Sequence, residues 1–238
     1  MAKTDLAFAQ NYTNALEVDV TPEKEAPTYM PLACGITSIT PSANESTEDK
    51  DYYDGYGVPS TDVQSNQIQY EVEGDRCYGD PAQDFISSRA LLTGDDRKTR
   101  FRHTASNGDV VEGKCTLLNL VPGSGQGEAS ALGAFSCTIA TSGRPEFKPA
   151  NKLTLPESIE AEDVEVAVGS TTKVTPTVTP TEAADKCFFG IEDRSVATVD
   201  ADGNVTGVKE GTTKLTVRCA AKPSLLKVVG VTVSGSAG

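Results

Sequence analysis

The sequence has 238 residues, of which 37% are hydrophobic, so it is long enough to bury one or two cores. Its formal net charge is −13, because 34 acids face 21 lysines and arginines. This balance excludes a surface built to hold nucleic acid, since phosphate binding depends on clustered Lys and Arg. No stretch stays apolar for the length that a membrane-spanning helix needs.

The N-terminus predicts a cytoplasmic protein, and this sets the expectation for the cysteines. Residues 1–6 contain neither an apolar run nor a cleavage-site pattern, so we expect no signal peptide and a protein made and kept in a cytoplasm. The cysteines contain no Cys-x-x-Cys pair and are expected to be buried free thiols. They are Cys34, Cys77, Cys115, Cys137, Cys187 and Cys219. A bridge between Cys187 and Cys219 is the alternative.

The first forty residues predict only short strands. Leu16, Val18 and Val20 alternate with acids, which is the period of a strand. Three prolines between residues 22 and 31 then interrupt the pattern. Residues 35–41 predict a second short strand.

Residues 42–62 are polar, acidic and rich in tyrosine and glycine, and they show no apolar periodicity. A segment of this length without periodicity predicts a loop, and long loops are usually functional or disordered. Tyrosines among small polar residues are typical of contact surfaces. We therefore predict an inter-subunit arm with Tyr52, Tyr53 and Tyr56 as its contact residues. A solvated loop is the alternative.

Residues 67–86 join a strand to a helix. Their apolar residues fall on alternate positions from Ile68 to Val72, which predicts a half-buried strand. Asp80 suits the N-cap of a helix and Pro81 its first position, and Asp84 places negative charge near the positive end of the helix dipole.

Later patterns are strands separated by turns. Residues 98–103 and 110–120 alternate on either side of Asn107-Gly108, the strongest short hairpin signal. A glycine-rich connection at 123–128 precedes a last strand at 132–141.

A change of composition begins at residue 142. Residues 142–151 predict a linker. Short Val- and Thr-rich runs between turns then predict a β-sandwich. These runs are 164–168, 172–179, 197–199, 204–208, 212–219 and 227–233. We expect a first domain at 1–147, a linker at 148–152 and a second domain at 153–234.

The second half resembles the bacterial immunoglobulin-like group 2 domain. The resemblance is carried by Asp193-Arg-Ser-Val-Ala-Thr-Val-Asp200, Asp202-Gly-Asn-Val-Thr-Gly-Val208 and Gly211-Thr-Thr-Lys-Leu-Thr-Val217. It covers roughly residues 152–234 and implies an immunoglobulin-like β-sandwich. Phe188 and Phe189 stand where the family often has Trp, and they are expected to fill the same core.

The first half resembles the major tail protein, or tail tube protein, of long non-contractile-tailed bacteriophages. The residues that carry this are Tyr70-Glu-Val-Glu-Gly-Asp-Arg-Cys-Tyr-Gly-Asp-Pro-Ala-Gln-Asp-Phe-Ile86. The order of early strands, acidic segment, short helix and later hairpins agrees over about residues 1–147. A group 2 immunoglobulin-like domain behind such a domain is a known pairing.

These resemblances imply a mainly β fold: a tail-tube β-sandwich or barrel with one short flanking helix, followed by the immunoglobulin-like sandwich. They imply a structural virion protein of the phage tail, assembled in the host cytoplasm. Its copies would form hexameric rings that stack around a tape-measure protein and contact other tail proteins. Viral DNA would pass through the lumen without specific binding, because an acidic wall repels phosphate.

The immunoglobulin-like domain is expected to project outward. Many copies would bind host surface polysaccharide weakly but with avidity. Decoration without a ligand is the alternative. No membrane partner is expected.

The sequence contains no catalytic constellation. His103 is the single histidine, and no Gly-x-Ser-x-Gly accompanies it. The glycines of 123–127 are followed by no Lys-Ser/Thr, and the cysteines lack zinc spacing. Asp200–Asn204 predicts a turn, not a calcium loop.

We therefore expect no enzyme, no cofactor and no metal site. The first alternative function is a bacterial surface adhesin fragment with an immunoglobulin-like domain, which would be found outside intact cells without phage. The second is a small hydrolase with a carbohydrate-binding appendage, which would turn over a glycan substrate.

Overall fold

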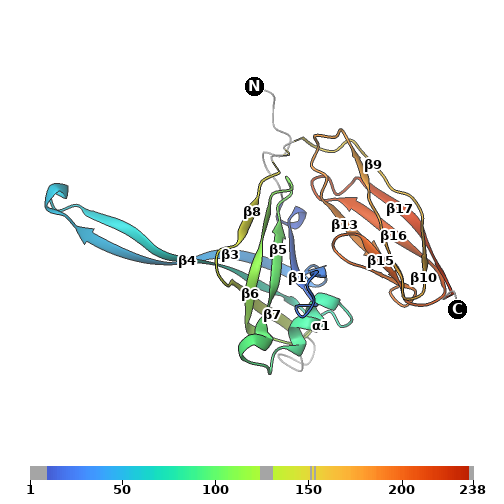
Figure 1. The fold of residues 1–238 in the computed structure, drawn as a ribbon, viewed down its shortest axis with the longest axis horizontal. Coiled ribbons are helices and arrows are strands. Elements are labelled where there is room, and N and C mark those ends of the chain that lie inside the picture. The colour runs from blue at the N-terminus through green and yellow to red at the C-terminus, as the bar shows by residue number, and fades with distance from the viewer. Residues whose placement is uncertain (1–9, 124–130, 151, 153, 236–238) are drawn as a thin grey trace. The chain divides into compact units, whose positions relative to one another are not determined.

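The structure is a computed structural model that describes residues 10–123, 131–150, 152 and 154–235 (Figure 1). The fold is mainly β, as predicted, and the described residues contain a single α-helix. Two compact units are formed from residues 1–32, 102–112 and 146–238, and from residues 33–101 and 113–145. Most of the predicted glycine-rich connection at 123–128 lies outside the described residues. No helix among the described residues is long and apolar enough to cross a membrane.

An eight-stranded sheet runs through the first 148 residues. Its order is β2-β1-β5-β6-β7-β4-β3, with β8 pairing with β6. Its strands are β1 (Ala15–Asp19), β2 (Tyr29–Pro31), β3 (Ile36–Asp51), β4 (Pro59–Asp75), β5 (Lys98–Thr104), β6 (Val110–Val121), β7 (Ala134–Thr141) and β8 (Glu146–Lys148). The described residues also form three short 3-10 helices, η1 (Asn11–Thr13), η2 (Tyr53–Gly55) and η3 (Gly94–Arg97).

The turn predicted at Asn107-Gly108 is confirmed. Gly108 has a φ of 90°, a backbone conformation that favours glycine. The Asn107 side chain accepts from the Asp109 backbone N–H at 3.1 Å, which closes the turn locally. His103 is half-buried in the preceding strand, and this burial lowers its pKa.

The strand–turn–helix prediction for residues 67–86 is also confirmed. The helix α1 spans Pro81–Ser88, with Pro81 in its first turn. The carboxylate of Asp80 accepts from the Gln83 backbone N–H at 3.0 Å, which satisfies one of the donors that a helix start leaves unpaired. Ala82 and Ile86 are fully buried and anchor the helix.

Replacing the cap tests this local argument. We expect Asp80→Ala to lower the free energy of unfolding by about 1 kcal/mol, because the N-cap bond is lost at a buried site. Asp80→Asn, which keeps an acceptor at the same position, should retain most of the stability. Denaturant titration of the three proteins measures the difference, and equal midpoints for Asp80→Ala and the unchanged protein would contradict the capping role.

Strand β1 is buried on both faces, although its apolar residues alternate with acids. All five of its residues are buried, including Glu17 and Asp19. The carboxylate of Asp19 accepts from the backbone N–H groups of Thr21 and Thr28 at 3.0 and 2.9 Å. These bonds close the turn that follows β1 and compensate the carboxylate for the water it has lost.

Glu17 is held by two cations. It accepts from Arg102 and from Lys186, the latter at 2.7 Å between Oε1 and Nζ. Arg102 also pairs with Asp202 at 2.8 Å, and its guanidinium lies 4.4 Å from the ring centre of Tyr29. The charge of Glu17 is therefore neutralised inside the fold, which is how a buried carboxylate is tolerated.

The predicted linker at 142–151 is partly wrong. Glu146–Lys148 form β8, which pairs antiparallel with β6 from Val110 opposite Lys148. Its three side chains are exposed, so no apolar pattern marked the strand. The assignment of whole domains to 1–147 and 153–234 stays a prediction.

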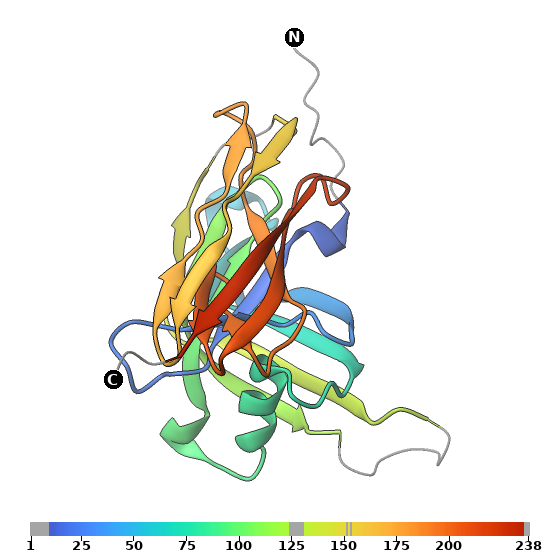
Figure 2. The same cartoon turned by 90° about the vertical axis from the view of Figure 1, so that its right-hand side faces the viewer.

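The C-terminal part is a set of short strands around one core. The strands are β9 (Ser158–Glu160), β10 (Val164–Ala167), β11 (Thr171–Lys173), β12 (Thr177–Thr179), β13 (Cys187–Ile191), β14 (Ala197–Val199), β15 (Asn204–Gly207), β16 (Gly211–Cys219) and β17 (Leu226–Ser234). The main sheet has the order β10-β17-β16-β13, and Figure 2 shows β16 and β17 side by side in orange and red.

The core of this part agrees with the alternation of its longest strands. Leu215, Val217, Val229 and Val231 are buried, and Phe189 packs against the same cluster. The run predicted at 172–179 is divided into β11 and β12, which lie in different sheets. The predicted Asp-Gly turn is present, because Asp200 accepts from the backbone N–H groups of Asp202 and Asn204.

Candidate functional site: the β3–β4 arm

The longest hairpin of the molecule extends away from its sheet. β4 pairs with β7 only from Gln69 to Asp75. Beyond that point β3 and β4 pair with each other from Ala43 opposite Ile68 to Asp51 opposite Pro59. We call residues 43–68 the arm. The nine residues of its β3 half span roughly 30 Å at the usual rise of a strand, and Figure 1 shows the arm in blue as a separate ribbon.

The prediction of a loop at 42–62 is therefore wrong. The segment is two ordered strands joined by η2. It gave no periodic signal because both of its faces are exposed: from Pro59 to Asn66 each residue of β4 is exposed. A strand with no buried face has no reason to alternate apolar and polar residues.

The arm has unpaired edges. Among the described residues neither of its strands has a second partner beyond Gln69, so each offers a row of free backbone N–H and C=O groups. An isolated two-stranded hairpin in water is at best marginally stable. Exposed strand edges are templates for pairing with another chain. The arm therefore offers backbone groups with which a further strand could pair.

The predicted contact residues Tyr52, Tyr53 and Tyr56 all lie at the tip of the arm. Tyr53 and Tyr56 are almost fully exposed and Tyr52 is 54% exposed. Sequence reasoning missed two further exposed apolar side chains, Val58 at the tip and Val63 on the β4 half. Tyr56 has a φ of 53°, which turns the chain so that β4 can return. The tip is the apolar end of an otherwise polar arm.

The base of the arm is fixed covalently. A disulfide joins Cys34, just before β3, to Cys77, just after β4, with Cα atoms 6.1 Å apart. The prediction that both are free thiols is wrong. The two cysteines are 43 residues apart in sequence, but the antiparallel pairing of β3 with β4 brings them together. The backbones also touch here: a Cβ on Gly74 would lie 2.3 Å from the carbonyl oxygen of Gly35.

A buried amide ties the helix to this base. Gln83 donates through Nε2 to the carbonyl oxygen of Cys34 at 2.6 Å and accepts through Oε1 from the Cys77 backbone N–H at 2.8 Å. Arg76, which directly follows β4, forms an ion pair with Asp84 of α1. One side chain thus bridges both cysteines, and the arm leaves a rigid base.

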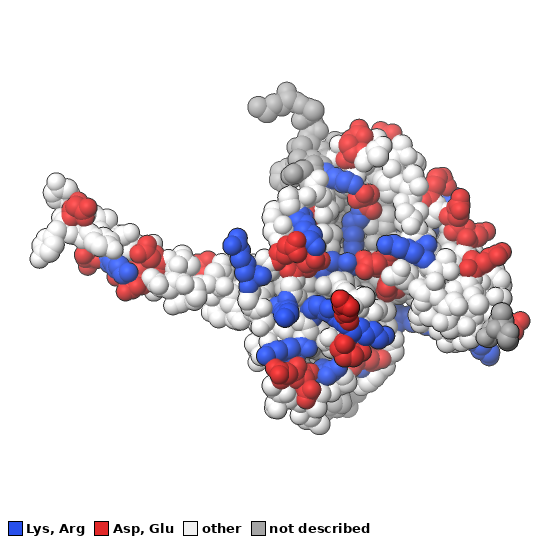
Figure 3. Space-filling model, viewed as in Figure 1, with Lys and Arg blue, Asp and Glu red and all other residues white. Residues whose placement is uncertain are grey.

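The arm is strongly acidic. Six carboxylates stand against one lysine, Lys50, and Figure 3 shows acids along its exposed surface. The acids are Glu45, Glu48, Asp49, Asp51, Asp54 and Asp62. Lys50 lies 3.2 Å from Glu48, and Asp49 accepts from Thr61 at 2.7 Å across the hairpin. The arm therefore has a formal charge of −5, and like charges of this density repel.

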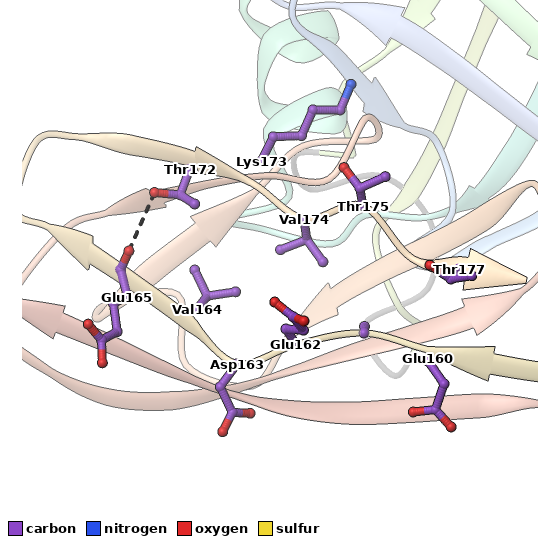
Figure 4. A pocket seen from close by; sticks show the side chains of 11 residues that line it. Glu160, Glu162, Asp163, Val164, Glu165, Thr172, Lys173, Val174, Thr175 and Thr177 are labelled. Atoms are coloured by element: carbon purple, nitrogen blue, oxygen red, sulfur yellow. Dashed lines mark hydrogen bonds between the residues drawn. The ribbon is translucent and has the colours of Figure 1, made fainter.

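The C-terminal part contains an open pocket of about 640 Å³ (Figure 4). It is lined by Glu160, Ala161, Glu162, Asp163, Val164, Glu165, Thr172, Lys173, Val174, Thr175 and Thr177. Thr172 donates to the carbonyl oxygen of Glu165 at 3.4 Å across it. The lining offers carboxylates and hydroxyls for hydrogen bonds but no aromatic ring on which a sugar would stack.

Comparison with known families finds a match within the C-terminal part. Residues 156–221 match the model of the family described as Bacterial Ig-like domain (group 2). A curated relative, an alpha-L-arabinofuranosidase from Bifidobacterium longum subsp. longum, is 46% identical over 67 residues. That match covers 28% of this chain and 5% of the enzyme, so the chain spans only a small part of that relative's length.

Comparison with solved structures finds partial structural matches at low sequence identity. The tail of an empty GTA particle, refined with C6 symmetry, is 14% identical, with 60% of this chain and 100% of that chain covered and a TM-score of 0.48. The virion of a native GTA particle is 13% identical, with 60% of this chain and 100% of that chain covered and a TM-score of 0.44. The cap that terminates the anti-feeding prophage tube is 15% identical, with 62% of this chain and 99% of that chain covered and a TM-score of 0.38.

Proposed function

We propose that this protein is a structural, non-enzymatic virion protein that polymerises into stacked hexameric rings and forms the tube of a phage tail. The observation that carries the proposal is the arm, an ordered hairpin with unpaired edges and a tyrosine tip. Its strands would find their missing partners, and its tip a pocket, on a neighbouring subunit of the next ring. The resemblance of residues 70–86 to the tail tube motif points to the same role.

The charge of the chain fits a conduit. With 34 acids against 21 bases, a lumen lined by this chain would repel the phosphate backbone. Viral DNA then passes on ejection without specific binding. The tape-measure protein and other tail proteins are the remaining partners, and the protein is assembled in the host cytoplasm and resides in the virion.

The immunoglobulin-like part has a separate role in this proposal. It decorates the outside of the tube and binds host surface polysaccharide weakly, with many copies supplying avidity. We expect that binding in the pocket lined by residues within 160–165 and 172–177, because its carboxylates and threonine hydroxyls match the hydroxyl groups of a sugar.

Sedimentation tests whether polymerisation depends only on the part of the chain before residue 149. The full chain and a chain that ends at residue 149 are both expected to pellet as polymer above a threshold concentration, because the arm and the sheet that carries it lie before residue 149. The truncated chain keeps Arg102 as a partner for Glu17. Polymer from the full chain alone would contradict the division of roles, and polymer from neither would contradict the proposed function.

A further inference from the structure

Two cysteines of the immunoglobulin-like part lie opposite each other on neighbouring strands of one sheet. Cys187 is the first residue of β13 and Cys219 the last residue of β16, and the two are register partners. Both side chains are buried in the same core cluster. Both are free thiols in the structure.

The backbone hydrogen bonds define the kind of pair that these residues form. Ala220 donates to the carbonyl oxygen of Lys186 at 2.8 Å, and Glu192 donates to that of Lys214 at 3.0 Å. These two bonds mark 186/220 and 192/214 as hydrogen-bonded pairs. Hydrogen-bonded and non-hydrogen-bonded pairs alternate along an antiparallel ladder, so Cys187 and Cys219, one position from 186/220, form a non-hydrogen-bonded pair. In such pairs the Cα atoms are about 4.5 Å apart and the side chains are closest. This spacing lies within the range of about 4.4–6.8 Å that disulfides require.

We infer that Cys187 and Cys219 are a redox-responsive pair that forms a second disulfide when the protein leaves a reducing compartment. The bond would staple the edge strand β13 to β16 and enclose β14 and β15 in a covalent loop. The inference stands independently of the tail role.

The reaction is a thiol–disulfide exchange with a small disulfide such as oxidised glutathione. The Cys219 thiolate attacks one sulfur of glutathione disulfide, which releases one glutathione thiolate and leaves a mixed disulfide. Cys187 then gives up its proton and attacks the Cys219 sulfur, which releases the second glutathione. The hydrogen bond between the thiols lowers the pKa of Cys219 and raises that of Cys187, which favours Cys219 as the first nucleophile.

The position of the pair gives the oxidant a path. β13 lies at the end of the sheet order, and the two cysteines are at the strand ends, where local opening costs least. The other two thiols are built differently: Cys115 lies opposite Thr141 and Cys137 opposite Val72. Neither faces a cysteine in these ladders, so they serve as an internal control.

The experiment maps the disulfides directly. The full chain is reduced, freed of reductant, exposed to oxidised glutathione, quenched with N-ethylmaleimide at set times and digested with trypsin. We expect the peptide 187–194 linked to 219–227, a loss of two titratable thiols beyond those of Cys34 and Cys77, and alkylation of Cys115 and Cys137 only after unfolding. Closure of the loop should raise the melting temperature of this part by about 10 °C.

Re-formation of Cys34–Cys77 in the same sample shows that the oxidant acts. If that bridge returns while Cys187 and Cys219 are recovered alkylated or as glutathione mixed disulfides, the inference is overturned. Cys187→Ser and Cys219→Ser should each abolish the thermal shift, whereas the double variant Cys115→Ser/Cys137→Ser should keep it. The peptide map of the unchanged chain decides the question even if a serine variant does not fold.

Discussion

A chain whose arm is cut short is expected to fold but not to polymerise. The register places Glu45 opposite Asn66, so residues 46–65 can be replaced by Asn-Gly, the turn that suits a two-residue hairpin loop. This change removes the tyrosine tip and the unpaired edges and leaves the Cys34–Cys77 base intact. We expect at least a tenfold rise in the concentration needed for assembly, because each contact of this size contributes more than the roughly 1.4 kcal/mol that corresponds to tenfold.

The tip alone should account for much of the effect. The triple variant Tyr52→Ser/Tyr53→Ser/Tyr56→Ser removes three exposed rings without changing the strands. The matched control is Tyr12→Ser/Leu91→Ser, which removes exposed apolar side chains outside the arm. Light scattering against concentration measures both. Assembly of the triple variant at the same threshold as the control would show that the tip makes no contact, and normal assembly of the shortened arm would refute the arm itself.

The second large effect is expected at Glu17. Glu17→Ala leaves the side chains of Arg102 and Lys186, each about 85% buried, without the carboxylate on which both converge. Removing one member of a buried ion pair typically costs about 3–5 kcal/mol, so we expect a loss of that order in the free energy of unfolding. Denaturant titration measures the change.

Two further variants separate charge from packing. Glu17→Gln keeps an oxygen that accepts from Lys186 and should lose less than Glu17→Ala. Replacing all three by apolar residues, Glu17→Leu/Arg102→Met/Lys186→Met, should recover most of the loss, since buried ion pairs are often replaceable by hydrophobic packing. Substitution of an ordinary surface residue changes the free energy of unfolding by less than about 0.5 kcal/mol. A loss as small as this for Glu17→Ala would contradict the structural role of Glu17.

The parts of the fold that the sequence predicted are those with local signals. Asp80 and Pro81 defined the start of α1 because capping depends on neighbouring residues alone. The Asn107-Gly108 turn and the Asp-Gly turn after Asp200 were predicted for the same reason. The strand runs predicted at 212–219 and 227–233 correspond to β16 and β17, and both strands bury alternate residues.

The parts that the sequence did not predict depend on distant residues. The arm lacks a buried face, so its strands carry no period, and only the register with the rest of β3 and β4 orders them. The Cys34–Cys77 bridge follows from that register, not from spacing. Gln83 looked like any helix residue until its amide was seen to bridge both cysteines. The tyrosines were found because aromatic residues in a polar segment are a compositional signal that needs no structure.

Negative-stain electron microscopy of the purified full chain at high concentration tests the central claim most directly. We expect long hollow tubes of uniform width, with six-fold symmetry in end-on class averages and small knobs from the immunoglobulin-like part on the outside. The shortened-arm variant, prepared in the same way, should show no tubes. Single particles that stay monodisperse at every concentration, or aggregates without a lumen, would contradict the claim that this chain builds a tail tube.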